Sequence, residues 1–103
     1  MLHSGGGTMD CRAVRFSRHA FERMFQRAIG PEAVAKIINK GKVIADYPDD
    51  KPYPSALLLG FHENRPIHVV VALDSAPGDC HVVTVYNPDP ELWDESFENR
   101  REA

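Results

Sequence analysis

Hydrophobic residues recur at helical spacing in a stretch near the N-terminus. Ser17 is a suitable N-cap and predicts a helix over about residues 18–28. At about 100° per residue, the apolar side chains fall on one side of this helix; they are Ala20, Phe21, Met24, Phe25 and Ala28. The other side gathers His19, Arg23, Gln26 and Arg27. The pattern therefore predicts an amphipathic helix with a basic polar face.

A second helix is predicted directly after a Gly-Pro break at residues 30–31. Proline is favoured in the first turn of a helix, and Val34, Ile37 and Ile38 then recur at helical spacing. Gly41 is suited to the C-terminal cap. We expect this helix to end there and to bury its apolar side.

The middle of the chain alternates between apolar and polar residues, as strands do. Four strands are predicted, at residues 43–47, 56–62, 67–73 and 81–86. In the third strand, one face carries Ile67, Val69, Val71 and Leu73; in the second, one face carries Leu57, Leu59 and Phe61. Short turns at 63–65 and 75–79 predict hairpins, whereas the prolines of 48–54 exclude regular pairing there.

These elements predict an α+β fold, with two N-terminal helices packed on one face of a roughly four-stranded, mostly antiparallel sheet. At 103 residues and 43% hydrophobic composition, the chain is long enough for one core. We expect a disordered, glycine-rich leader over 1–9, a single domain over 10–97 and a frayed tail over 98–103. Trp93 is expected to dock on the domain.

The chain shows no stretch approaching the roughly 20 apolar residues that cross a bilayer, and no secretory signal. We therefore expect a cytoplasmic protein without a membrane partner. Cys11 and Cys80 lie far apart, without a CxxC spacing, and both are expected to be reduced. A disulfide between them stays open, because spacing alone does not place the two Cα atoms.

The charge is divided unevenly along the chain. Residues 1–43 carry eight Lys or Arg against three acidic residues, whereas residues 44–103 carry four against twelve. Such an asymmetry can mark an anionic partner at the basic end. An ordinary solvated helix face explains it equally well, because net charge governs association and not fold.

The most suggestive constellation is formed by His19, Arg23 and Arg27, which share one side of the first helix. An imidazole can move a proton near neutral pH, and guanidinium groups can hold a phosphate and stabilise charge that grows in a transition state. These residues therefore fit a phosphodiester. The alternative is that they are solvated surface charges.

Two polar residues in the strands are further candidates. His68 alternates onto the face opposite Ile67, and either His68 or Tyr86 could face the helix site or be a hydrogen-bonded sheet residue. His62 and His81 are interpreted as surface strand positions. No HxxxH, HExxH or paired CxxC spacing is present, so neither a metal nor another cofactor is expected.

A family resemblance rests on four strings: FSRHAFERMFQRAIG, PYPSALLLGF, RPIHVVVALD and HVVTVYNPDPELW. The His-x3-Arg-x3-Arg spacing, the glycine after the second helix and the Tyr-x-Pro-Asp-Pro run resemble the small prokaryotic family of domains of unknown function numbered 4258. That family is similar in fold to the RelE, barnase and colicin ribonuclease toxins, and its members are often encoded beside small zinc-binding antitoxin-like proteins. The resemblance implies a RelE/barnase-like fold and a toxin of a toxin–antitoxin pair.

The leading hypothesis is a metal-independent ribonuclease that cleaves RNA by 2′-hydroxyl attack. His19 would move a proton, Arg23 and Arg27 would hold the phosphate, and Tyr86 or His68 would assist. The alternative is a non-catalytic protein-binding module that uses the basic helix face or a strand edge. A third reading is an antitoxin-like protein that uses the acidic half. RNA and an antitoxin are thus the expected partners, and no oligomeric state is predicted.

Overall fold

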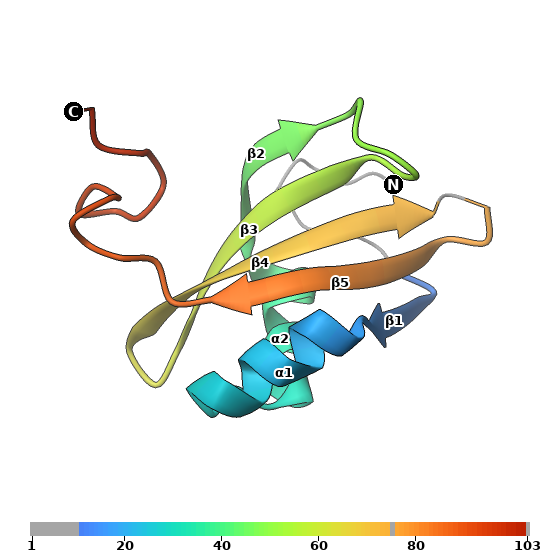
Figure 1. The fold of residues 1–103 in the computed structure, drawn as a ribbon, viewed down its shortest axis with the longest axis horizontal. Helices are drawn as coiled ribbons and strands as arrows, with labels where there is room; N and C mark the ends of the chain where they lie inside the picture. Colours follow the sequence, from blue (N-terminus) through green and yellow to red (C-terminus); the bar gives the residue numbers. More distant parts are fainter. Residues whose placement is uncertain (1–10, 75, 103) are drawn as a thin grey trace.

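The computed structural model describes residues 11–74 and 76–102, so the predicted leader over 1–9 lies outside the described residues. The element order is β1 (Ala13–Phe16), α1 (Arg18–Arg27), α2 (Pro31–Lys40), β2 (Lys42–Tyr47), β3 (Ser55–His62), β4 (Arg65–Asp74) and β5 (Asp79–Tyr86). The predicted α+β class, both helices and the four predicted strands are confirmed (Figure 1). None of the helices in the described ranges is long and apolar enough to cross a membrane.

The sheet has five strands and is mixed, which corrects the prediction of about four antiparallel strands. Its order is β1-β5-β4-β3-β2. The additional strand, β1, pairs in parallel with β5, and all other pairs are antiparallel. The β3–β4 hairpin turns through Glu63 and Asn64, whose φ angles of 54° and 66° suit the two-residue turn that matches strand twist.

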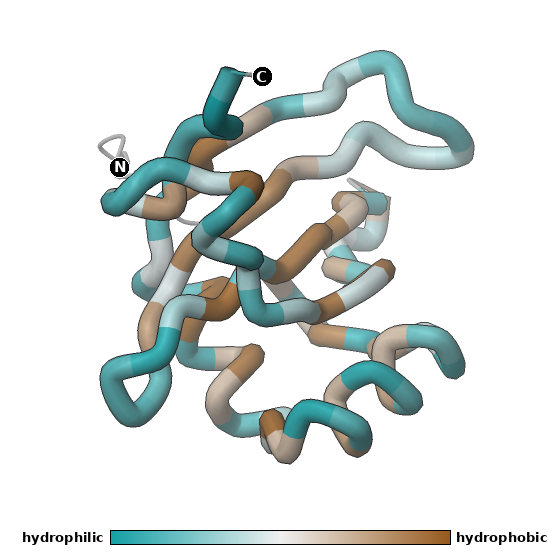
Figure 2. The backbone as a smooth tube through the Cα atoms, turned by 60° about the vertical axis from the view of Figure 1, so that its left-hand side comes forward, coloured by the Kyte–Doolittle hydropathy of each residue, from teal (hydrophilic) through white to brown (hydrophobic). Residues whose placement is uncertain are grey.

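Both helices pack on one face of the sheet, which we call the inner face. The core there joins Ala20 and Met24 of α1 to α2 and to alternate residues of β3, β4 and β5. The predicted alternation of β4 is confirmed, since Ile67, Val69 and Val71 are fully buried in this core. Figure 2 shows the hydrophobic positions gathered along the strands, while the connecting loops and the C-terminal segment are mostly hydrophilic.

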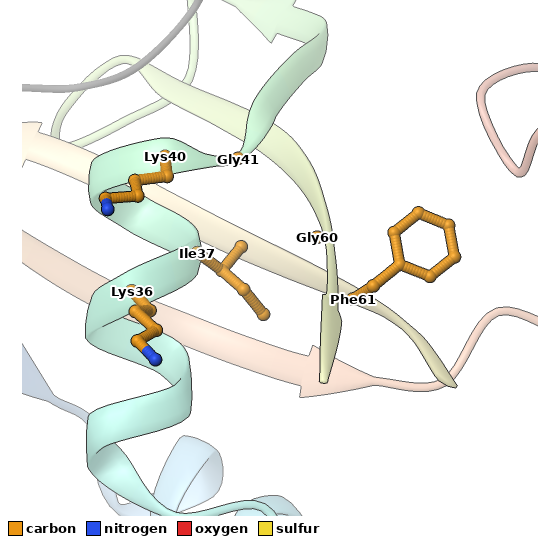
Figure 3. A pocket seen from close by; sticks show the side chains of 6 residues that line it. All are labelled: Lys36, Ile37, Lys40, Gly41, Gly60 and Phe61. Carbon is orange, nitrogen blue, oxygen red and sulfur yellow. The ribbon is translucent and has the colours of Figure 1, made fainter. Parts of the chain in front are cut away.

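A close approach of α2 to β3 determines where the helix lies. The side chain of Ile37 points from α2 toward Gly60 (Figure 3), and a Cβ at residue 60 would run into it. Gly41 ends α2, as predicted, in an extended conformation with φ of −73°. A Cβ there would meet the Leu59 carbonyl at 2.8 Å. Both glycines are therefore needed for this packing rather than for a left-handed backbone.

The apolar side predicted for α1 is wrong in part. Only Ala20 and Met24 of this helix are buried, whereas Phe21 is 51% exposed and Phe25 is 89% exposed. The reason is that α1 packs against β5, near one edge of the sheet. Neighbouring structure therefore covers a narrow stripe of α1. We call Phe21 and Phe25 the aromatic flank.

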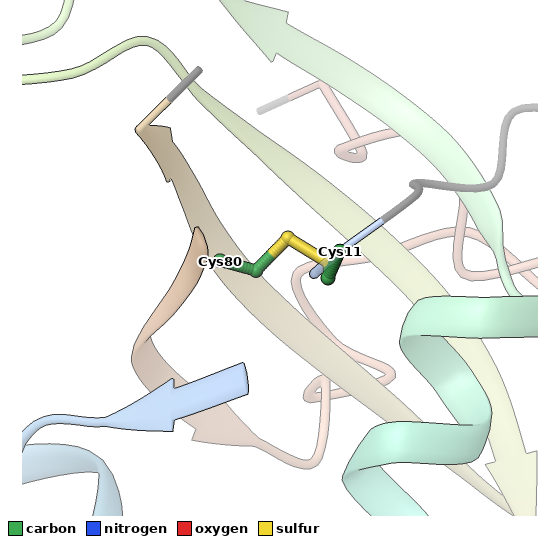
Figure 4. Close-up of a disulfide and its surroundings, with 2 residues drawn as sticks. All are labelled: Cys11 and Cys80. Carbon is green, nitrogen blue, oxygen red and sulfur yellow. A yellow bond between two sulfur atoms is a disulfide. The ribbon is translucent and has the colours of Figure 1, made fainter. Parts of the chain in front are cut away.

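The cysteines form a disulfide, which corrects the expectation that both are reduced. The Cys11 and Cys80 Cα atoms lie 5.5 Å apart, and the bond joins the start of the described chain to β5 (Figure 4). The cause is β1, whose parallel pairing brings the preceding residues alongside β5: the Arg12 amide donates to the Gly78 carbonyl. This long-range strand pairing brings the two cysteines together, which their spacing in the sequence does not predict.

The C-terminal tail, residues 88–102, lies against the opposite, outer face of the sheet. A row of cross-strand partners crosses this face, from Lys42 through Leu59 and His68 to Tyr86. The tail touches the row at Lys42, through Glu98, and at His68. Trp93 is 9% exposed, so its predicted docking is confirmed.

The described part of residues 98–103, for which the sequence predicts fraying, is folded back on the start of the tail. The Arg101 amide donates to the Leu92 carbonyl, and Arg100 bridges to Trp93. These backbone contacts hold the chain end beside the residue that docks.

Candidate functional site

A polar row runs along the outer face of β5. Asp79, His81, Thr84 and Tyr86 point to this face, because their cross-strand partners on β4 alternate with the core residues of that strand. A bulge opposite residues 70 and 71 inserts Val83, which accounts for the three-residue step from His81 to Thr84. One strand thus presents four polar side chains on a single face.

The start of α1 is fixed to the edge of β5, just where the pairing with β1 ends. The Ser17 amide donates to the Val82 carbonyl, and the Ser17 hydroxyl donates to the Val83 carbonyl. The same hydroxyl accepts from the Ala20 amide, which confirms Ser17 as the N-cap. The first turn of α1 therefore lies beside the polar row.

This attachment brings His19 to the row. Its Nε2 lies 3.1 Å from the Thr84 hydroxyl oxygen, while the residue itself is exposed. Among the hydrogen bonds of the described residues, this is the one that His19 side-chain atoms make. The contact orients the ring, and it leaves Nδ1 available for proton transfer.

Arg23 and Arg27 follow His19 along the same flank, and both are exposed. Figure 1 shows α1 and β5 running in the same general direction. Arg23 is one turn beyond His19, about 6 Å along the helix. Tyr86 is two residues beyond Thr84, about 7 Å along the strand. We therefore expect Arg23 to lie level with Tyr86, with Arg27 beyond the end of β5.

Tyr86 and His68 form a second pair on the same face. The His68 Nε2 lies 2.8 Å from the Phe97 carbonyl oxygen, which can only accept, so Nε2 carries the proton. The Tyr86 hydroxyl therefore donates to Nδ1, 3.2 Å away. Burial lowers the pKa of His68, although the bond to Phe97 opposes this, and burial raises the pKa of Tyr86. Both side chains are thus neutral near pH 7.

The predicted site residues therefore do not meet in one cluster, and only His68 and Tyr86 contact each other directly. His19 lies at the α1 edge of β5 with Thr84, whereas the Tyr86 hydroxyl is turned toward β4. His68 is fully buried, with both ring nitrogens bonded inside the protein, so it does not reach a bound substrate in this arrangement. A cavity of about 310 Å³ lies elsewhere, between α2 and the end of β3, beside Lys36, Ile37 and Phe61 (Figure 3).

Sequence reasoning missed Thr84 and Asp79. Thr84 is an ordinary strand residue, and only its place in the alternation of β5 could have pointed to it. Asp79 is 5% exposed. Its carboxylate forms ion pairs with the Arg15 Nε at 2.8 Å and with an Arg12 guanidinium nitrogen at 3.1 Å. The hydrogen bond from Arg15 is the main cause that lowers the Asp79 pKa. This cluster depends on β1, which the sequence did not predict.

The described residues hold no group of three or more His, Cys, Asp or Glu side chains placed to bind a metal ion.

The sequence model of the family described as "Domain of unknown function (DUF4258)" matches residues 16–87. The match includes all elements from α1 to β5 and ends before the tail. Comparisons with curated proteins and with solved structures gave no match.

Proposed function

We propose that the chain, which belongs to the DUF4258 family, is a metal-independent ribonuclease. The proposal carries forward the resemblance of that family to the RelE, barnase and colicin ribonucleases. Its role would be that of a toxin held in check by an antitoxin protein. The observation that carries the proposal is the contact between His19 and Thr84, which orients an exposed imidazole on the side of α1 that also carries two exposed arginines.

In the proposed reaction, His19 Nδ1 takes the proton of the RNA 2′-hydroxyl. The 2′-oxygen forms a bond to the adjacent phosphorus, the bond from phosphorus to the 5′-oxygen breaks, and a 2′,3′-cyclic phosphate results. Tyr86 donates the proton that the leaving 5′-oxygen needs. Its raised pKa keeps the hydroxyl protonated at neutral pH, and the donation requires that the hydroxyl turn away from His68.

Arg23 and Arg27 bind the phosphate in this proposal. Guanidinium groups match the oxygens of a phosphodiester and stabilise the extra negative charge of the transition state. His68 acts as a positioning residue, since its hydrogen bond holds the Tyr86 ring. This indirect role replaces the direct contact with substrate that the sequence allows for His68, because its ring is fully buried.

The test is cleavage of a mixed-sequence RNA by the purified protein in EDTA. His19→Ala and Arg23→Ala should each lower the rate by about 10²-fold or more. Gln26→Ala changes an exposed residue of the same helix and should cleave like the wild type. A folded wild-type protein that leaves RNA intact across pH and salt would contradict the proposal.

The aromatic flank favours a second candidate, a non-catalytic protein-binding module. Two large apolar side chains one helical turn apart, exposed by 51% and 89%, are typical of a protein contact. In this case RNA would stay intact, and Arg23→Lys would preserve partner binding because the contact needs the aromatic flank and, at residue 23, only a positive charge. The ribonuclease instead needs the guanidinium geometry, so the same variant would lower its rate.

A further inference from the structure

The tail reaches across the row that runs from Lys42 through Leu59 and His68 to Tyr86. The Glu98 carboxylate lies 2.9 Å from the Lys42 Nζ, at one end of this row. Further along, the His68 Nε2 donates to the Phe97 carbonyl, and the rings of His68 and Trp93 stand nearly perpendicular, at 88°, with centroids 4.5 Å apart. These contacts span three neighbouring strands.

The row of sheet residues that the tail crosses has the character of a binding surface and not of a solvated sheet face. Leu59 is 5% exposed and His68 is fully buried, although both lie on the face away from the helices. Lys42 adds a positive charge at one end and Tyr86 a hydroxyl at the other. An apolar centre with polar ends is typical of a docking surface.

The tail is held to this surface by few bonds and is organised mainly by itself. The Asp94 carboxylate accepts from Ser96, and it also accepts from the Asn99 amide side chain. These hydrogen bonds are the main causes that lower the Asp94 pKa to about 2. The Lys42–Glu98 pair, in contrast, is a partly exposed ion pair, and such pairs contribute little. The tail can therefore leave the sheet with its own fold kept.

The boundaries of the family match give an independent reason to separate the tail from the surface. The match ends at residue 87, so the surface belongs to the family domain and the tail lies beyond it. From these observations we propose that the tail is an intramolecular occupant of a protein-docking surface formed by Lys42, Leu59, His68 and Tyr86. The partner that replaces it is an acidic chain segment with one large aromatic side chain.

We infer the chemical properties of the partner from those of the tail that it would replace. Residues 88–102 carry six acidic residues against two arginines, which complements Lys42. The neutral His68 offers an N–H, so the segment must present an acceptor such as a backbone carbonyl. The Trp93 ring stands nearly perpendicular to the imidazole, and the Arg100 guanidinium of the tail lies 5.6 Å from the centre of the Trp93 ring. An indole or a similar ring fits this position.

The test uses a fluorescein-labelled peptide with the sequence of residues 88–102 and the full-length chain. In the wild type the attached tail competes at an effective concentration in the millimolar range. The Trp93→Ala chain, whose own tail is loosened, should bind the peptide at least tenfold more tightly than the wild type. Leu92→Ala, which changes a 47% exposed tail residue, is the matched control and should behave like the wild type.

Two further variants, Glu98→Lys and Lys42→Glu, test the same proposal by changing charged residues on the surface. Glu98→Lys loosens the tail without touching a buried side chain, so it replaces Trp93→Ala if that variant does not fold. Adding Lys42→Glu to the Trp93→Ala chain places a like charge opposite Glu98 of the peptide and should weaken peptide binding about threefold, as expected for an exposed pair. Equal affinity of the wild-type and tail-loosened chains, no binding to either, or equal binding of a scrambled peptide would overturn the proposal. The outcome does not depend on RNA cleavage.

Discussion

His68 donates a hydrogen bond from Nε2 to the carbonyl oxygen of Phe97, 2.8 Å away, and this bond links β4 to the tail. Burial is the main cause that lowers the pKa of His68 below its ordinary value of 6.5. The unfolded chain therefore takes up a proton at this residue at a higher pH than the folded chain does. Stability associated with His68 is complete above pH 6.5 and is lost as the pH falls toward the lower, folded pKa.

We accordingly expect the urea concentration at the unfolding midpoint of the wild type to decrease when the pH is lowered from 7 to 5. His68→Gln should be less stable at pH 7, because glutamine does not reproduce the packing of the buried imidazole ring. Its urea midpoint should change less between pH 7 and pH 5, because glutamine does not titrate. Urea unfolding at several pH values, followed by circular dichroism, checks this. Parallel pH curves for the two proteins would show that His68 does not cause the loss.

The approach of α2 to β3 predicts a specific cost at residue 60. Gly60→Ala forces its new Cβ into Ile37, which should lower the free energy of unfolding by about 1–3 kcal/mol. Gly30→Ala is the matched control, because nothing lies within 4 Å of a Cβ there, and it should cost less than about 1 kcal/mol.

A double-mutant cycle identifies the cause. Combined with Ile37→Ala, the Gly60→Ala change should cost less than it does alone, because the clashing atoms are gone. Additive effects in urea unfolding would assign the cost to something other than this contact.

The disulfide predicts a strong effect of reductant. Cys11 and Cys80 are separated by 69 positions, and opening such a loop should lower the free energy of unfolding by about 3–4 kcal/mol. Urea unfolding with and without a phosphine reductant measures the difference. Cys11→Ser should be insensitive to the reductant. Thiol titration of the native protein gives an independent check, since two reactive thiols before reduction would contradict the bond.

Much of the fold could be predicted because its signals are local. The alternation of Ile67, Val69 and Val71 indicates both the strand and its buried face, and Ser17 indicates the start of α1. The strand β1 gave no such signal: four residues are too short for a period, and their partners begin at Asp79. The disulfide was missed for the same reason.

The candidate site was predicted in its residues more than in its geometry. Helical spacing places His19 and Arg23 on one flank of α1, but it does not say which strand lies beside that flank. The contact between His19 and Thr84 depends on the attachment of Ser17 to β5. Similarly, the polarity of His68 gives no sign that the tail covers it.

The aromatic flank gives a prediction within one helix. Periodicity places Phe25 beside Met24, yet Phe25 is 89% exposed and Met24 only 2% exposed. Met24→Ala should therefore cost about 2–5 kcal/mol, whereas Phe25→Ala should stay within about 0.5 kcal/mol of the wild type. Urea unfolding of the two variants and the wild type measures both changes in the free energy of unfolding. A large loss in Phe25→Ala would mean that the ring is covered in solution.

The last prediction follows from the proposed ribonuclease and concerns Thr84. Thr84→Val keeps the shape of the side chain but removes the hydroxyl that orients His19, so the imidazole loses a fixed position. We expect kcat/KM for RNA to fall about tenfold, less than the loss of about 10²-fold or more expected for His19→Ala. Thr84→Ser retains a hydroxyl and should remain near the wild type. If Thr84→Val is folded and cleaves RNA like the wild type while His19→Ala is inactive, then His19 acts without this contact, and the geometry that links α1 to the polar row of β5 is structural only.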